Sequence, residues 1–326
     1  GLRSVQETDQ DVYPIPALRR YRWEGVVERP QRVVFGIGLA LATAVRAIEV
    51  YRPEGERIYD ARSDYALLPT FWRWLMLPGI RHGLMAVLEK TEMGTPGMLW
   101  CRTRFIDEAL VAALGEGIEQ VVCLGAGFDT RAYRMPGVEA TRFFELDLPE
   151  PQSLKREYLQ KRLGSLPAHV IFVPIDFDRQ SIADEMGAAG YQPGVRTFLI
   201  WEGVTQYITA EAVDATLRFA NSAAPGSKVA FTYVDCGIID GSKRSKIDER
   251  IMSRVKRRGM PWVFGLDPDE VGEWLRRRGF RILDHTGAAD YRARYLAPVG
   301  RKATVYEGES MILAEVAGVP GEAVSG

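Results

Sequence analysis

The stretch VVCLGAGFDTRAYRM, residues 121–135, decides the fold because it joins an apolar run directly to a glycine turn. Residues 121–124 are apolar and end at a turn signal, which is typical of a buried strand. Gly125 and Gly127 follow at once, and glycine lets the backbone turn sharply beside a bound molecule. The stretch therefore predicts a strand, a ligand-binding turn and a helix in that order.

The chain around this stretch alternates between strand-like and helix-like segments. Residues 103–117 and 150–164 carry helical patterns that end at glycines. Apolar segments predict seven strands, at residues 120–124, 141–147, 169–178, 196–203, 227–235, 280–287 and 310–318. Strands separated by helices favour right-handed crossovers, so we expect a mostly parallel seven-stranded sheet with helices on both faces.

In such a sheet the ligand lies at the carboxyl ends of the strands, near the point where the strand order reverses. The residues at these ends are the candidates for the site. They are Gly125, Ala126 and Gly127 after the first strand, Glu145 and Asp147 at the second, Asp176, Phe177 and Asp178 at the third, and Glu202 at the fourth.

Two classes of cofactor use a strand, glycine turn and helix, namely dinucleotides and S-adenosylmethionine (SAM). A dinucleotide fold prefers a third glycine where this chain has Thr130, and its pyrophosphate faces the start of the helix. Asp129 places a carboxylate there, which would repel a pyrophosphate. These residues disfavour NAD without eliminating it.

SAM has no phosphate and needs an acid for its ribose hydroxyls. Asp147 follows Gly127 by 20 residues and is placed for the ribose, with Glu145 as a helper or a competitor. Asp176 offers an acceptor for the adenine amine, and Phe177 offers apolar packing to the ring. The acids at these strand ends therefore favour SAM.

The composition bounds the possible partners. Among 326 residues, 42 Lys and Arg nearly balance 43 Asp and Glu, so we expect no nucleic-acid partner. Three cysteines have no metal-ligand spacing, which predicts reduced thiols, a cytoplasmic protein and no metal site. The most apolar stretch, residues 33–45, is too short for a membrane span and predicts a buried helix in a cap.

Five further motifs make the chain resemble the leucine carboxyl methyltransferase family of class I SAM-dependent methyltransferases, and specifically its bacterial small-molecule O-methyltransferases. The motifs are RTRFIDEAL (102–110), GAGFDTRAYR (125–134), FELDLPEPQSLKREYL (144–159), IDFD (175–178) and WEGVTQYIT (201–209). Residues 52–69 and 294–301 also resemble segments of bacterial members. The resemblance implies a Rossmann-like methyltransferase fold, with SAM as cofactor and S-adenosylhomocysteine (SAH) as product.

The resemblance also implies roles for single residues. It places Arg102 on the SAM carboxylate, Glu202 near the methionine amine, and Asp147 on the ribose. Gly125 and Gly127 line the methionine part, while Asp176 and Phe177 meet the adenine. Ala126 and Asp129, in the same turn, are further candidates for cofactor binding. The lysine that forms the family's most N-terminal cofactor contact has no match here, which leaves that contact in doubt, and Arg46 is the candidate to replace it.

Methyl transfer from a sulfonium is an in-line displacement, so the enzyme mainly has to orient the acceptor. A carboxylate acceptor needs no base, whereas a hydroxyl acceptor does. The candidate catalytic residues are His285, at the end of the sixth strand, and Tyr207, after the fourth. His169 and His82 are read as structural and cap residues respectively.

We divide the chain into an N-terminal helical cap, residues 1–100, and a SAM-binding core, residues 101–326, within one compact unit. The aromatic-rich residues 70–85 of the cap favour a small hydrophobic acceptor of natural-product type. The leading hypothesis is an O-methyltransferase of secondary metabolism. The alternatives are a nicotinamide-dependent oxidoreductase and a SAM-fold protein that binds or cyclises a ligand without methylating it.

Overall fold

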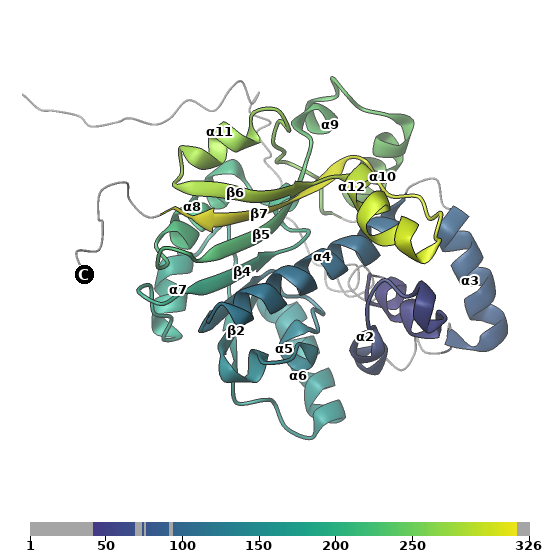
Figure 1. The fold of residues 1–326 in the computed structure, drawn as a ribbon. Helices are drawn as coiled ribbons and strands as arrows, with labels where there is room; N and C mark the ends of the chain where they lie inside the picture. Colours follow the sequence, from purple (N-terminus) through teal and green to yellow (C-terminus); the bar gives the residue numbers. More distant parts are fainter. Residues whose placement is uncertain (1–41, 69–73, 75, 91–93, 258, 318–326) are drawn as a thin grey trace, which may run out of the picture.

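The computed structural model describes residues 42–317, apart from 69–73, 75, 91–93 and 258, and shows a twisted sheet covered by helices (Figure 1). The sheet has seven strands in the order β3-β2-β1-β4-β5-β7-β6. The strands are β1 (Gln120–Leu124), β2 (Arg142–Asp147), β3 (Val170–Pro174), β4 (Thr197–Trp201), β5 (Lys228–Val234), β6 (Phe280–Thr286) and β7 (Glu309–Val316). The prediction of a mostly parallel, seven-stranded α/β fold is confirmed.

The strand order places a switch point between β1 and β4. From β1 the chain moves outward through β2 and β3, and it then returns to the other side of β1 with β4. These five parallel strands, β3 to β5, meet β7, which is antiparallel to both β5 and β6. The glycine turn after β1 and the acid after β4 therefore lie beside each other at the same edge of the sheet.

Apolar strands divide the core into two layers, one on each face of the sheet. All residues of β1, β4 and β5 are buried, as expected for strands covered on both faces. One core layer joins the sheet to α4 (Thr95–Gly115), and the other joins it to α7 (Ile182–Ala188), α8 (Ala210–Asn221) and α11 (Val271–Arg276). Other helices in the described part of the chain are α2 (Arg62–Leu67), α3 (Pro78–Lys90), α5 (Arg131–Arg134), α6 (Pro149–Leu163), α9 (Cys236–Asp240), α10 (Lys246–Arg257) and α12 (Ala288–Tyr291), and residues 42–47 are also helical.

The structure shortens the third predicted strand the most and lengthens one predicted helix. The third strand ends at Pro174 rather than at residue 178, because proline cannot continue the ladder of hydrogen bonds as a donor. Helix α4 begins at Thr95, eight residues before the predicted start at 103, with Pro96 in its first turn. It therefore runs across the proposed boundary between cap and core at residue 100.

The proposed cap is only partly within the described residues. Residues 1–41, and with them most of the apolar stretch 33–45, lie outside, as do five of the residues in the segment 70–85. The described part is packed into the core layer of α4, where Ala44, Ile48 and Ala61 are buried. None of the described helices is long and apolar enough to cross a membrane.

Helix α4 packs closely against the C-terminal segment, so a methyl group added at this contact should destabilise the protein. A Cβ at Gly97 in α4 would lie 2.3 Å from the backbone oxygen of Thr304, whereas a Cβ at Gly187 in α7 meets nothing within 4 Å. We expect Gly97→Ala to lower the free energy of unfolding by about 1–3 kcal/mol, the usual cost of overpacking.

Urea denaturation measures this change, and Gly187→Ala serves as the matched control. Because alanine favours helix over glycine by about 1 kcal/mol, the control should be neutral or more stable. Equal stability of the Gly97→Ala variant and the parent would contradict the packing of α4 described here.

Candidate functional site

A network of buried ion pairs lies at the switch point. It joins four arginines to five acids, and its members come from elements far apart in the sequence. The members are Arg46, Arg102, Arg131, Arg134, Asp64, Asp107, Asp129, Glu202 and Glu309. A buried charge is costly unless it is paired, so this arrangement constrains where each side chain can lie.

Arg102 and Glu202, two of the predicted cofactor-binding residues, form an ion pair within this network. Arg102, on α4, donates from Nε to Oε1 of Glu202 at 2.7 Å and from Nη1 to Oε1 of Glu309 at 2.6 Å. Burial opposes the charge on Arg102, but the two carboxylates outweigh it and raise its pKa. Burial would likewise raise the pKa of Glu202, yet Arg102 and Arg131 lower it well below its usual value. Both groups therefore stay charged at neutral pH.

Arg131 is the central residue of the network, and the sequence reasoning missed it. Its side chain is 2% exposed, and it donates to Asp107, Glu202 and the backbone oxygen of Thr103. It also pairs with Asp129, whose carboxylate thereby turns towards the protein. The signal was present in the DTR of the glycine-turn motif, where an arginine begins a helix next to a buried acid.

Arg46 reaches the same site from the N-terminal region. It donates to Oδ1 of Asp64 and to the backbone oxygen of Phe128, each at 3.0 Å. Burial lowers the pKa of Arg46, but nearby negative charges outweigh this effect and the pKa is raised. Asp64 contributes most among these charges, and Glu202 and Asp129 also contribute. Arg46 is therefore beside the glycine turn.

The glycine turn itself is tied to the end of β2. Asp147 accepts a hydrogen bond from the backbone N–H of Gly127 at 2.5 Å and another from Leu148 at 2.7 Å. Gly125 has a φ of +66°, and a Cβ there would lie 2.4 Å from Val204, which follows β4. The turn is thus closely packed between the ends of β2 and β4, and its backbone is held by the predicted ribose acid.

Glu145 belongs to a separate buried cluster. Its Oε2 lies 2.8 Å from Nζ of Lys155 on α6, and its Oε1 accepts from the hydroxyl of Tyr133 at 2.9 Å. Both charged side chains are 1% exposed. In the structure the Glu145 side chain thus binds residues of α5 and α6, whereas the Asp147 side chain binds the glycine turn.

Asp176 and Phe177 follow the end of β3 in a loop. Both are partly exposed, and Asp176 accepts from the backbone N–H of Asp178 at 3.1 Å. The predicted adenine side of the site is consequently more open than the methionine side.

The two candidate catalytic residues lie at different distances from the switch point. Tyr207 ends a 3₁₀ turn (Thr205–Tyr207) directly after β4. His285 lies on the edge strand β6, four strand spacings from β1, which is roughly 19 Å at about 4.8 Å each. Its Nε2 is 2.9 Å from the hydroxyl of Tyr233, and burial lowers its pKa below the usual value. The structure therefore brings Tyr207 near the site and leaves His285 at the far side of the sheet.

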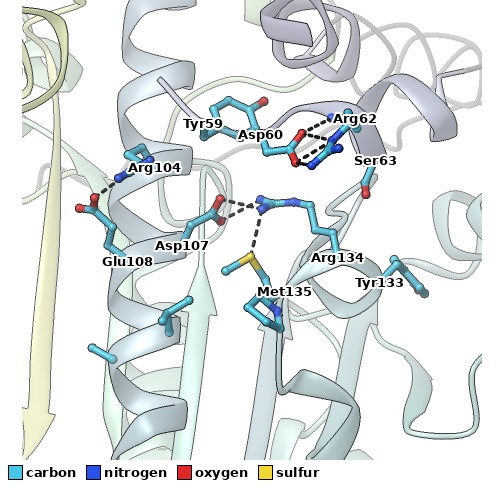
Figure 2. Close-up of a pocket in the computed structure, with 13 residues that line it drawn as sticks. Tyr59, Asp60, Arg62, Ser63, Arg104, Asp107, Glu108, Tyr133, Arg134 and Met135 are labelled. Carbon is cyan, nitrogen blue, oxygen red and sulfur yellow. Dashed lines mark hydrogen bonds and ion pairs between the residues drawn. The ribbon is translucent and has the colours of Figure 1, made fainter. Parts of the chain in front are cut away.

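A groove of about 850 Å³ lies next to the network, between the start of α2 and helices α4 and α5. Figure 2 shows Arg134 in this groove, paired with Asp107, while Asp60 holds Arg62 and Glu108 holds Arg104. The groove's arginines are thus neutralised by their own neighbours. Gly125, Gly127 and Asp147 do not line it, so it is separate from the predicted cofactor site. Among the described residues, no cluster of His, Cys, Asp or Glu could hold a metal ion.

Comparison with known proteins identifies the family. A sequence model of leucine carboxyl methyltransferases matches residues 40–221, more than half of the chain. The chain belongs to the leucine carboxyl methyltransferase family. The expected resemblance is therefore confirmed, and the family identifies SAM rather than a dinucleotide as the cofactor.

Relatives within the leucine carboxyl methyltransferase family carry the same assignment. A Frankia alni protein, 33% identical over 66% of this chain and 72% of its own length, is named "Putative S-adenosyl-L-methionine-dependent methyltransferase". A Streptomyces coelicolor protein of the same description is 33% identical over 57% of this chain, but the match spans only 62% of its length. The crystal structure of a DUF574 family protein from Streptomyces avermitilis has the same fold, with a TM-score of 0.52 at 16% identity over 82% of this chain and 99% of its own.

The position of Asp147 predicts a loss of cofactor affinity on its neutralisation. Asp147→Asn removes the negative charge of the carboxylate that accepts from Gly127. The same carboxylate would accept hydrogen bonds from the ribose hydroxyls. We expect Asp147→Asn to weaken SAH binding by tenfold or more, at least about 1.4 kcal/mol. Isothermal titration calorimetry measures this change, and Glu139→Gln, an exposed acid before the same strand, is the control. Unchanged affinity in a folded Asp147→Asn variant would remove Asp147 from the site.

Proposed function

We propose that the protein is a SAM-dependent O-methyltransferase that acts on a carboxylate or hydroxyl of a small, hydrophobic molecule of natural-product type. The observation that carries the proposal is the pair of Arg102 and Glu202 beside the Gly127–Asp147 turn at the switch point. Membership of the leucine carboxyl methyltransferase family supports oxygen as the acceptor atom. Three free cysteines support a cytoplasmic setting.

The network provides two opposite charges for the amino-acid end of SAM. A guanidinium binds a carboxylate well, so we assign the SAM carboxylate to Arg102. A carboxylate that stays ionised suits an ammonium group, so we assign the methionine amine to Glu202. Asp147 would take the ribose, Asp176 and Phe177 the adenine, and the turn from Gly125 to Asp129 the methionine backbone.

The methyl transfer itself requires few side-chain groups. The acceptor oxygen attacks the methyl carbon opposite to the sulfur, the carbon–sulfur bond breaks, and SAH leaves with the electron pair on sulfur. A carboxylate acceptor is already ionised at neutral pH and needs only orientation, for which Tyr207, in the turn after β4, is a candidate.

An acceptor screen tests the proposal. The purified protein is incubated with methyl-labelled SAM and matched pairs of small aromatic molecules that carry either a carboxyl or a phenolic hydroxyl group. We expect label in a neutral product, either a methyl ester that mild base hydrolyses or an ether that it does not. Labelled nitrogen or carbon products alone, or no transfer to any acceptor despite SAH binding, would contradict O-methylation.

The location of His285 predicts that it is dispensable for a carboxylate acceptor. We expect His285→Ala to keep kcat within about twofold, because the ionised acceptor needs no base. If a hydroxyl acceptor uses His285, kcat should fall at acid pH, as the pH drops through the pKa of His285, which burial holds below the usual histidine value. Initial rates between pH 5 and 8 separate the two cases, because only a base role makes the acid limb disappear in the variant.

A further inference from the structure

Glu309 is a buried acid that none of the sequence motifs includes. It is the first residue of β7, and its side chain is 6% exposed. Among the described residues, its carboxylate has one hydrogen-bond partner, Nη1 of Arg102 at 2.6 Å. A carboxylate that is buried against a single arginine acts on the molecule through that arginine.

Arg102 is held at two of its three nitrogens. Glu202 takes Nε and Glu309 takes Nη1, and the two acids come from opposite sides of β5 in the sheet, one after β4 and one from β7. Nη2 has no hydrogen-bond partner among the residues that the structure describes. Gly203 lies next to it, and a Cβ there would be 3.1 Å from Nη2. One nitrogen of this guanidinium is therefore open to a further acceptor.

Two anchors have a different effect from one. A guanidinium held only at Nε can still turn about its side-chain bonds, whereas a second hydrogen bond at Nη1 fixes the plane of the group. The second acid also has a cost, because burial raises the pKa of Glu309, an effect that Arg102 only partly offsets. Orientation of Arg102 gives a physical reason for keeping this acid.

We propose that Glu309 is a positioning residue that fixes the guanidinium of Arg102 so that Nη2 faces the carboxylate of the bound cofactor. This inference rests on the proposed assignment of Arg102 to that carboxylate. Glu309 does not touch the cofactor in this account, and an uncharged acceptor at the same place does the same task.

Calorimetric titration with two ligands tests the inference. SAH carries the amino-acid carboxylate, whereas 5′-methylthioadenosine shares its adenosine and sulfur but lacks that group. We expect Glu309→Ala to weaken SAH binding about tenfold and to leave 5′-methylthioadenosine within about twofold. Glu309→Gln should restore SAH affinity to within about threefold, because its amide oxygen can still accept from Nη1. Glu315→Ala, an acid near the other end of β7 that pairs with Arg281, is the matched control and should change neither ligand.

The Arg102→Ala variant separates the failure of this inference from the failure of the site assignment. If Arg102→Ala weakens SAH but Glu309→Ala does not, the positioning role is wrong and the cofactor site stands. Equal losses of both ligands in Glu309→Ala would reveal general damage and overturn the role as well. No effect of Arg102→Ala on SAH would overturn the assignment and the inference together. The double variant should bind SAH as Arg102→Ala does, because Glu309 acts only through Arg102.

Discussion

The pairing of buried charges at the switch point is the constraint on which the site depends. Arg131 is 2% exposed and binds acids from α4, from the glycine turn and from the end of β4. Removing any one partner would leave a charge in a region with little water, which is far more costly than losing a surface ion pair. The network therefore fixes these elements relative to each other before any cofactor binds, and a preorganised charge needs no rearrangement when the ligand arrives.

The same network explains why the site draws on so much of the chain. Arg46 comes from the N-terminal region, Arg102 from α4, Glu202 from the end of β4 and Glu309 from β7. These residues are separated by up to 263 positions in the sequence, from Arg46 to Glu309, but meet at one edge of the sheet. In the proposed site the glycine turn would leave room for the cofactor, and the charges around it would recognise its amino-acid end.

The sequence predicted those features of the fold that depend on local patterns of residues. The apolar runs located all seven strands, because a buried strand is visible as a short apolar stretch. Asp147 was expected at the end of the second strand and lies there, where it accepts from Gly127. The sequence did not predict which charged side chains pair with each other. Glu145 was expected beside Asp147 at the ribose, yet Lys155 and Tyr133 bind it, and that pairing depends on how α5 and α6 pack. Arg131 and Glu309 were missed because their partners are distant in sequence and carry no motif of their own.

A crystal structure of the complex with SAH tests this account most directly. The account predicts that the amino-acid carboxylate of SAH binds Nη2 of Arg102, that Glu202 lies next to its amine and that Asp147 accepts from the ribose hydroxyls. Arg102 should keep its bonds to Glu202 and Glu309 in the complex. SAH bound away from the β1–β4 switch point, or an Arg102 that contacts only its two acids while SAH occupies the turn, would contradict it.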